Sequence, residues 1–203
     1  MKFRGTIFAG PEISDRSLLA KLPGGYAGFL EDTNGLIAFD GGLHIRGVCD
    51  NPEWHSLAAV SGGDHALHGM FNSIQPTDIP FAQDCLGDQF ILRASKVFRV
   101  SAETDNIECL DADFAQFIEK AEAQPIQFLH LEPLVQFMRD GGRLRPGELL
   151  SAYPPFCTEE AAQGVHLEAA PMFQRLEVLS QISRQLSKLG DGTKFKIEFD
   201  GRA

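Results

Sequence analysis

Two aspartates four residues apart, Asp84 and Asp88, flank a Leu-Gly step in the segment IPFAQDCLGDQF at residues 79–90. Carboxylates at this spacing can hold a metal ion or act as an acid/base pair. They can also build a turn, because Asp accepts backbone N–H bonds there and Gly87 can adopt a positive φ. We favour the turn, with partner contact as the second interpretation. Replacing Asp84 with Ala is then expected to cost about 1–2 kcal/mol, by analogy with lost helix caps.

Other residues with catalytic or metal-binding potential lack the partners that such chemistry requires. His65 and His68 lie three apart, a metal-ligand spacing on a helix, but no third ligand motif follows them. Cys157 lies in the apolar segment PPFC without a nearby His, and the chain contains no GxSxG motif. The four cysteines form no CxxC pair, which is typical of reduced thiols. We therefore predict no catalytic residue, no metal site and no cofactor.

The charge distribution indicates which partners the chain can bind. A net charge of −10 argues against nucleic acid or an anionic membrane. Residues 31–119 carry 15 acidic and 4 basic side chains, and residues 47–92 contain no Lys or Arg. This stretch is compatible with a solvated surface, but it also predicts a basic protein partner. Its single Trp is a candidate anchor, because Trp is enriched in interface hot spots. The predicted partner-binding residues are Asp50, Glu53, Trp54, Asp64, Asp84 and Asp88.

The elements that must position these residues are predicted from apolar periodicity. Residues 1–122 are expected to form an α+β core, a mostly antiparallel sheet flanked by helices. The predicted strands are a hairpin around residues 40–42 and a meander at 79–82, 89–93, 96–100 and 107–110. Helices are predicted after an N-cap at Ser14, from Pro23 to Asn34, and after Asp111 or Asp113, where Phe114, Phe117 and Ile118 share one face.

Residues 123–203 are predicted to form a C-terminal α/β extension that packs on this core as one cooperative unit. Pro125 and Pro133 suit the first turns of short helices, and residues 144–157 are predicted to be irregular because they are rich in proline. A strand at 164–170, an amphipathic helix at 171–188 and an alternating strand at 193–199 complete the prediction.

The chain has the features of a cytoplasmic protein. No run approaches 18 consecutive apolar residues, so no transmembrane helix is predicted. The apolar run near the N-terminus is too short for a secretory signal.

Several motifs in order resemble the SUKH superfamily, which includes fungal cell-wall-synthesis regulators and bacterial toxin-immunity proteins. They are LPGGYAGFLEDTNGLIAF, DIPFAQDCLGDQFIL, VFRV and DFAQFIEKA, within residues 18–122. The resemblance implies an α+β fold and a non-catalytic, protein-binding role, and it carries over no catalytic residue. We expect an immunity protein that covers and neutralises a basic toxin domain. The alternatives are a cytosolic scaffold for endogenous proteins and a small hydrolase with a dispersed site.

Overall fold

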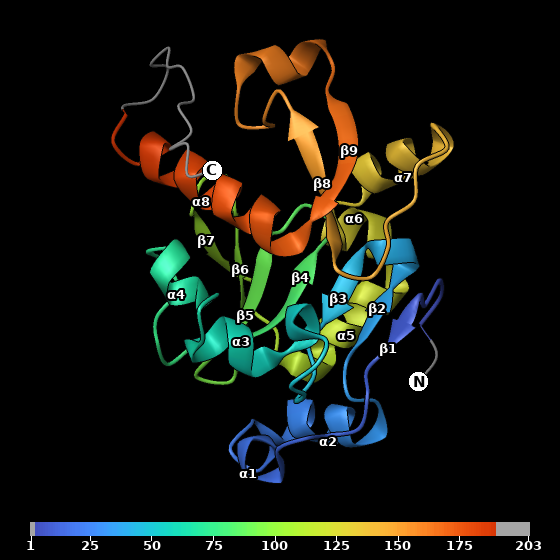
Figure 1. Cartoon of the computed structure of the whole chain (residues 1–203), viewed down its shortest axis with the longest axis vertical. Coiled ribbons are helices and arrows are strands. Elements are labelled where there is room, and N and C mark those ends of the chain that lie inside the picture. The colour runs from blue at the N-terminus through green and yellow to red at the C-terminus, as the bar shows by residue number, and fades with distance from the viewer. Residues whose placement is uncertain (1–2, 190–203) are drawn as a thin grey trace.

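An antiparallel sheet of seven strands forms the centre of the protein. The structure, a computed structural model, describes residues 3–189 (Figure 1). The strands follow one another in the sheet in chain order. They are β1 (Phe8–Ala9), β2 (Leu36–Ala38), β3 (Leu43–Ile45), β4 (Ile79–Asp84), β5 (Gln89–Arg93), β6 (Lys96–Val100) and β7 (Ile107–Cys109). The α+β class, the hairpin around residues 40–42 and the meander are therefore confirmed, whereas β1 is a strand that the sequence did not predict.

Helices cover both faces of the sheet. They are α1 (Arg16–Leu19), α2 (Gly24–Asp32), α3 (Leu57–Gly62), α4 (Leu67–Met70), α5 (Phe114–Ala123), α6 (Pro125–Leu129), α7 (Glu132–Arg139) and α8 (Met172–Leu186). The predicted cap at Ser14 was wrong: Asp15 caps α1 by accepting the N–H groups of Ser17 and Leu18. Asp113 begins α5 with a reciprocal capping box to Gln116, which decides between the two caps predicted there.

The alternation of side chains along β5 divides the core into two clusters. Phe90 and Leu92 point to one face and pack with helices α2 and α5, whose buried aromatic residues include Tyr26 and Phe117. Ile91 points to the other face and packs with helices α3, α4 and α8. The sheet is therefore buried on both faces along this strand.

His44 of β3 and His55, which follows in the chain, form a buried histidine pair. His44 Nε2 lies 2.9 Å from His55 Nδ1, and His55 Nε2 lies 2.8 Å from the carbonyl oxygen of Asn34. That carbonyl can only accept, so Nε2 of His55 carries a hydrogen and its Nδ1 accepts from His44. Burial lowers the pKa of His44 well below its ordinary value and the pKa of His55 to about 4, so both rings are neutral at physiological pH.

The C-terminal part adds a second, two-stranded antiparallel sheet formed by β8 (Glu148–Tyr153) and β9 (His166–Pro171). The prediction of irregular structure over residues 144–157 was therefore wrong at its centre. The predicted strand at 164–170 and helix at 171–188 correspond to β9 and α8, and the predicted strand at 193–199 lies outside the described residues.

The extension packs against the sheet, and whether the two parts unfold as one cooperative unit stays a prediction. Leu176 and Leu179 of α8 share a buried cluster with Ile91. The N–H of Leu150 in β8 donates to the carbonyl of Cys85 in the β4–β5 turn at 2.7 Å. These contacts bring the extension next to the turn that carries the two aspartates.

Candidate functional site

The turn between β4 and β5 is built around the carboxylate of Asp84. Its Oδ1 accepts the backbone N–H groups of Leu86, Gly87 and Asp88 at 2.9, 3.1 and 3.0 Å. Gly87 has a φ of +98°, and a Cβ there would lie 2.9 Å from Leu179 Cδ1. Both the positive φ and the close approach of α8 require glycine. The turn-building interpretation of Asp84 is confirmed, and the residue is only 1% exposed.

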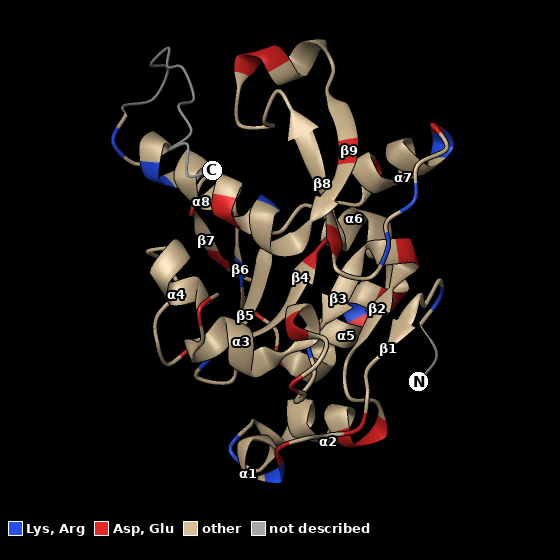
Figure 2. Cartoon of the chain, viewed as in Figure 1, with Lys and Arg blue, Asp and Glu red and all other residues tan. Residues whose placement is uncertain are grey.

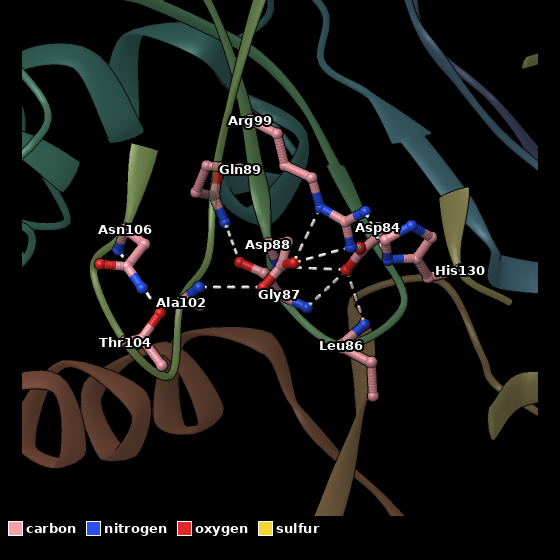
Figure 3. A network of polar contacts seen from close by, with 10 residues as sticks. All are labelled: Asp84, Leu86, Gly87, Asp88, Gln89, Arg99, Ala102, Thr104, Asn106 and His130. Atoms are coloured by element: carbon pink, nitrogen blue, oxygen red, sulfur yellow. Dashed lines mark hydrogen bonds and ion pairs between the residues drawn. The ribbon is translucent and has the colours of Figure 1, made fainter. Parts of the chain in front are cut away.

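Arg99 from β6 joins the two aspartates (Figure 3). Its Nη2 lies 3.0 Å from Asp84 Oδ2 and 2.7 Å from Asp88 Oδ2. Burial, and then the Asp88 carboxylate, raises the pKa of Asp84, whereas Arg99 and the backbone donors act in the opposite direction. The other Asp88 oxygen accepts the N–H of Ala102 at 2.9 Å. The cluster thus ties the β4–β5 turn to the end of β6.

His130, at the junction of α6 and α7, is the third side chain that bonds to Arg99. Arg99 Nη1 lies 2.8 Å from His130 Nδ1. A guanidinium can only donate, so Nδ1 accepts and the ring hydrogen is on Nε2. His130 has a φ of +54° at the end of α6, a conformation that few residues other than glycine adopt. Arg99 is therefore held from three sides by groups of this chain.

A second buried arginine lies behind the turn. Arg46 is fully buried, and its Nη2 donates to the side-chain oxygens of Gln83 and Gln89. The amide of Gln89 then donates to the carbonyl of Gly87 at 2.6 Å, which connects Arg46 to the turn. Burial lowers the pKa of Arg46 to about 10, so it remains a cation at neutral pH.

A groove of about 550 Å³ opens beside Arg99. Its walls come from the β4–β5 turn, from β6 and the loop after it, from the α6–α7 junction, and from the loop after β8. The groove therefore lies where the sheet meets the C-terminal extension. Its titratable lining residues are Asp88, Arg99, Glu103, His130, Glu132 and Cys157.

The thiol in this groove is unsuited to nucleophilic chemistry. Burial, and then the neighbouring Glu103, raises the pKa of Cys157 to about 12, so the thiol stays protonated at neutral pH. The Glu103 carboxylate accepts the backbone N–H groups of Phe156 and Cys157 at 3.2 and 2.9 Å, which fixes the loop after β8. Within residues 3–189, no group of three or more His, Cys, Asp or Glu side chains could hold a metal ion.

One side of the groove continues into a hairpin, here called the arm (residues 148–171), which projects from the rest of the protein (Figure 1). Tyr153 is 76% exposed and Phe156 is 39% exposed. No Lys or Arg lies between Arg145 and Arg175, whereas four glutamates do, two of them at the tip of the arm (Figure 2). This surface was not predicted, although the same signal, a stretch without Lys or Arg, is present at residues 146–174.

The structure separates the six predicted partner-binding residues. Asp84 and Asp88 belong to the Arg99 cluster, whereas the carboxylates of Asp50, Glu53 and Asp64 lie on exposed residues elsewhere. Partner contact by any of the six stays a prediction.

Trp54, the predicted apolar anchor, is half-buried. It packs edge-on against Phe8, with ring centroids 4.8 Å apart, and its indole lies against Gly147, just before the arm. Much of the indole is therefore used in packing, and only part of it faces solvent.

The fold resembles that of Atu4351 from Agrobacterium tumefaciens. The crystal structure of that protein superposes with a TM-score of 0.51 and 14% sequence identity, over 87% of this chain and 85% of that one. An identity this low shows a shared fold and nothing about function. No family model and no curated protein matches the sequence. Among the helices between residues 3 and 189, none combines the length and apolar character needed to cross a membrane.

Proposed function

We propose that this chain is a non-catalytic protein-binding module, and specifically a bacterial immunity protein that covers a basic toxin domain in the cytoplasm. The arm is the observation that carries the proposal. It projects from the sheet, it contains glutamates and no Lys or Arg, and it exposes Tyr153 and Phe156. Exposed aromatic residues are enriched in protein interfaces, and an acidic surface accelerates association with a basic partner.

The resemblance of residues 18–122 to the SUKH superfamily supports the same class of function. A blocking interface needs roughly 1,200–2,000 Å² of buried surface in total. The arm and the groove beside it are a continuous surface on which such an interface could be centred.

The groove itself favours binding over catalysis. Its candidate nucleophile, Cys157, is a protonated thiol. Asp88 and His130, two of the candidate acid/base groups, are both bonded to Arg99, and Glu103 binds two backbone N–H groups, which leaves Glu132 as the carboxylate without such a bond. A general base needs a free acceptor within reach of the proton that it removes, and the acceptors of Asp88, His130 and Glu103 instead hold the fold together.

The test is co-expression with the C-terminal domain of a large secreted protein encoded by a neighbouring gene. We expect the chain to restore growth and to form a stable complex with that domain. Tyr153→Ala should weaken the complex, whereas Ile107→Ala should not, because Ile107 is also exposed but lies on the edge strand β7.

Cys157→Ala should protect as well as the wild-type chain. Protection that required Cys157 would indicate an enzyme. Undiminished toxicity together with the absence of a complex would contradict an immunity role.

A further inference from the structure

We infer that the groove receives a basic side chain, Arg or Lys, from a loop of the protein partner. This inference rests on the proposed function, since it assumes a partner protein, and it adds the place and chemistry of one contact. It is carried by the charge of the lining, by an exposed aromatic wall, and by the lack of a free cation in the lining.

The lining of the groove is acidic, and its one positive charge, on Arg99, is already paired with aspartates of this chain. Asp88, Glu103 and Glu132 face the groove together with one arginine, Arg99. Arg99 is bonded to Asp84, Asp88 and His130 and is 9% exposed, so it cannot readily receive an anion from outside. A cation entering the groove would therefore meet uncompensated negative charge.

Glu132 is the carboxylate best placed to meet that cation. It is exposed at the first residue of α7, and among residues 3–189 no ion pair forms with it within 4 Å. Glu103, by contrast, already binds two backbone N–H groups and lies 3.7 Å from Arg175. An incoming guanidinium would thus gain a new ion pair with Glu132 without breaking an existing one.

The remaining walls suit a guanidinium attached to a peptide backbone. Phe156 offers an exposed ring, over which a cation is stabilised by the ring quadrupole. The hydrogen on His130 Nε2 is available to donate to a backbone carbonyl of the same loop. A volume of about 550 Å³ lies within the range of ligand sites, so a long side chain and part of its backbone fit.

The test uses the full chain and two short peptides that differ in one charge. The probe is acetyl-Gly-Arg-Gly-amide, and the control replaces Arg with citrulline, which has nearly the same shape and is neutral. Binding is followed by the backbone amide shifts of the ¹⁵N-labelled protein. We expect the Arg peptide to shift Thr104, Glu132 and Phe156, to bind more weakly at higher salt, and the citrulline peptide to have little effect.

Variants locate the contact. Glu132→Gln should weaken Arg-peptide binding by about threefold, the effect of one partly exposed ion pair. Phe156→Ala should weaken it as well, through loss of the cation–π contact. Glu122→Gln, at an exposed position on α5, and Glu53→Gln, in the acidic stretch at 47–92, should leave the binding unchanged.

Equal binding of the two peptides, no amide shifts in the groove, or shifts around Glu53 instead would overturn the inference. A partner complex that forms with unchanged affinity when Glu132 and Phe156 are both replaced would overturn the groove contact and leave the proposed function intact. Failure to form any partner complex, with specific Arg-peptide binding retained, would overturn the proposed function and leave the groove as a site for basic side chains.

Discussion

Replacing Asp84 with Ala should lower the free energy of unfolding by about 3 kcal/mol, more than a lost helix cap. The variant removes the acceptor for three backbone N–H groups at once. The N–H of Gly87 is in a buried bond, and in the variant it keeps only a 3.3 Å bond to the backbone carbonyl of residue 84. Its loss should therefore cost about 1 kcal/mol, the lower end of the cost of an unsatisfied buried donor. The bonds from Leu86 and Asp88 are partly buried, so water can replace the acceptor there, and each loss should cost about 0.5–1 kcal/mol.

The ion pair with Arg99 adds little to this loss. Breaking a buried ion pair by removing one partner commonly costs about 3–5 kcal/mol, because the other charge is left alone. Arg99, however, keeps Asp88 and His130 as partners. Removing Asp84 also removes its repulsion with Asp88, one of the causes that raise the pKa of Asp84. The two effects oppose each other, which leaves the turn as the main contribution.

Asp84→Asn is the matched control, because its side-chain oxygen can still accept the three N–H groups while the negative charge is gone. We expect Asp84→Asn to lower the free energy of unfolding by about 1 kcal/mol. The difference of about 2 kcal/mol between the Ala and Asn variants then measures the contribution of the three hydrogen bonds in the turn. Urea unfolding followed by circular dichroism gives both values, provided that the m-value is unchanged. Equal losses for the two variants, or a loss below about 1 kcal/mol for Ala, would refute the reasoning.

Two further predictions concern the extension and the buried histidines. A fragment of residues 1–122 should aggregate or remain unfolded, because removing α8 uncovers Ile91 and removing β8 leaves the carbonyl of Cys85 without its donor. A soluble fragment with a cooperative melting transition would instead show two independent domains. The free energy of unfolding should also fall as the pH drops from about 6.5 toward 4, and His55 should contribute up to about 3 kcal/mol of this loss. The pKa of His55 is lower in the folded protein than in the unfolded chain, so the unfolded chain binds the proton first. Urea unfolding at several pH values should therefore show that His55→Gln is less damaging at pH 4.5 than at pH 7.5, and a constant difference would contradict the neutral, buried ring.

The elements that the sequence predicted correctly are those with strong local signals. The capping box at Asp113 and the apolar face of Phe114, Phe117 and Ile118 lie within one helix, so no long-range information is needed to predict it. The four strands of the meander alternate and are joined by short turns, which together fix both their type and their pairing.

Strand β8 was predicted to be irregular because the segment around it is rich in proline. Pro146 and Pro154 lie on either side of the strand, and Glu148–Tyr153 contains no proline. Proline excludes a strand only where its missing N–H would have joined the ladder. Pro146 and Pro154 therefore mark the limits of β8 and do not exclude it.

The position of the proposed partner surface could not be predicted from the sequence, because a stretch without basic residues does not define an acidic face. Within residues 47–92, Asp78 is paired with Arg93, and both Asp84 and Asp88 are paired with Arg99. Both arginines come after the end of that stretch in the chain, and the pairing of β4, β5 and β6 brings them next to it in space. Half of its six acids are therefore paired with an arginine.

The arm shows the opposite outcome for the same sequence signal. Its two strands pair mainly with each other, so no neighbouring strand brings cations to its glutamates. Tyr153 and Phe156 remain exposed between those glutamates for the same reason. Strand pairing therefore decides whether the acids of such a stretch are paired with arginines or stay exposed, and this is why we place the proposed partner contact on the arm and its groove and not on residues 47–92.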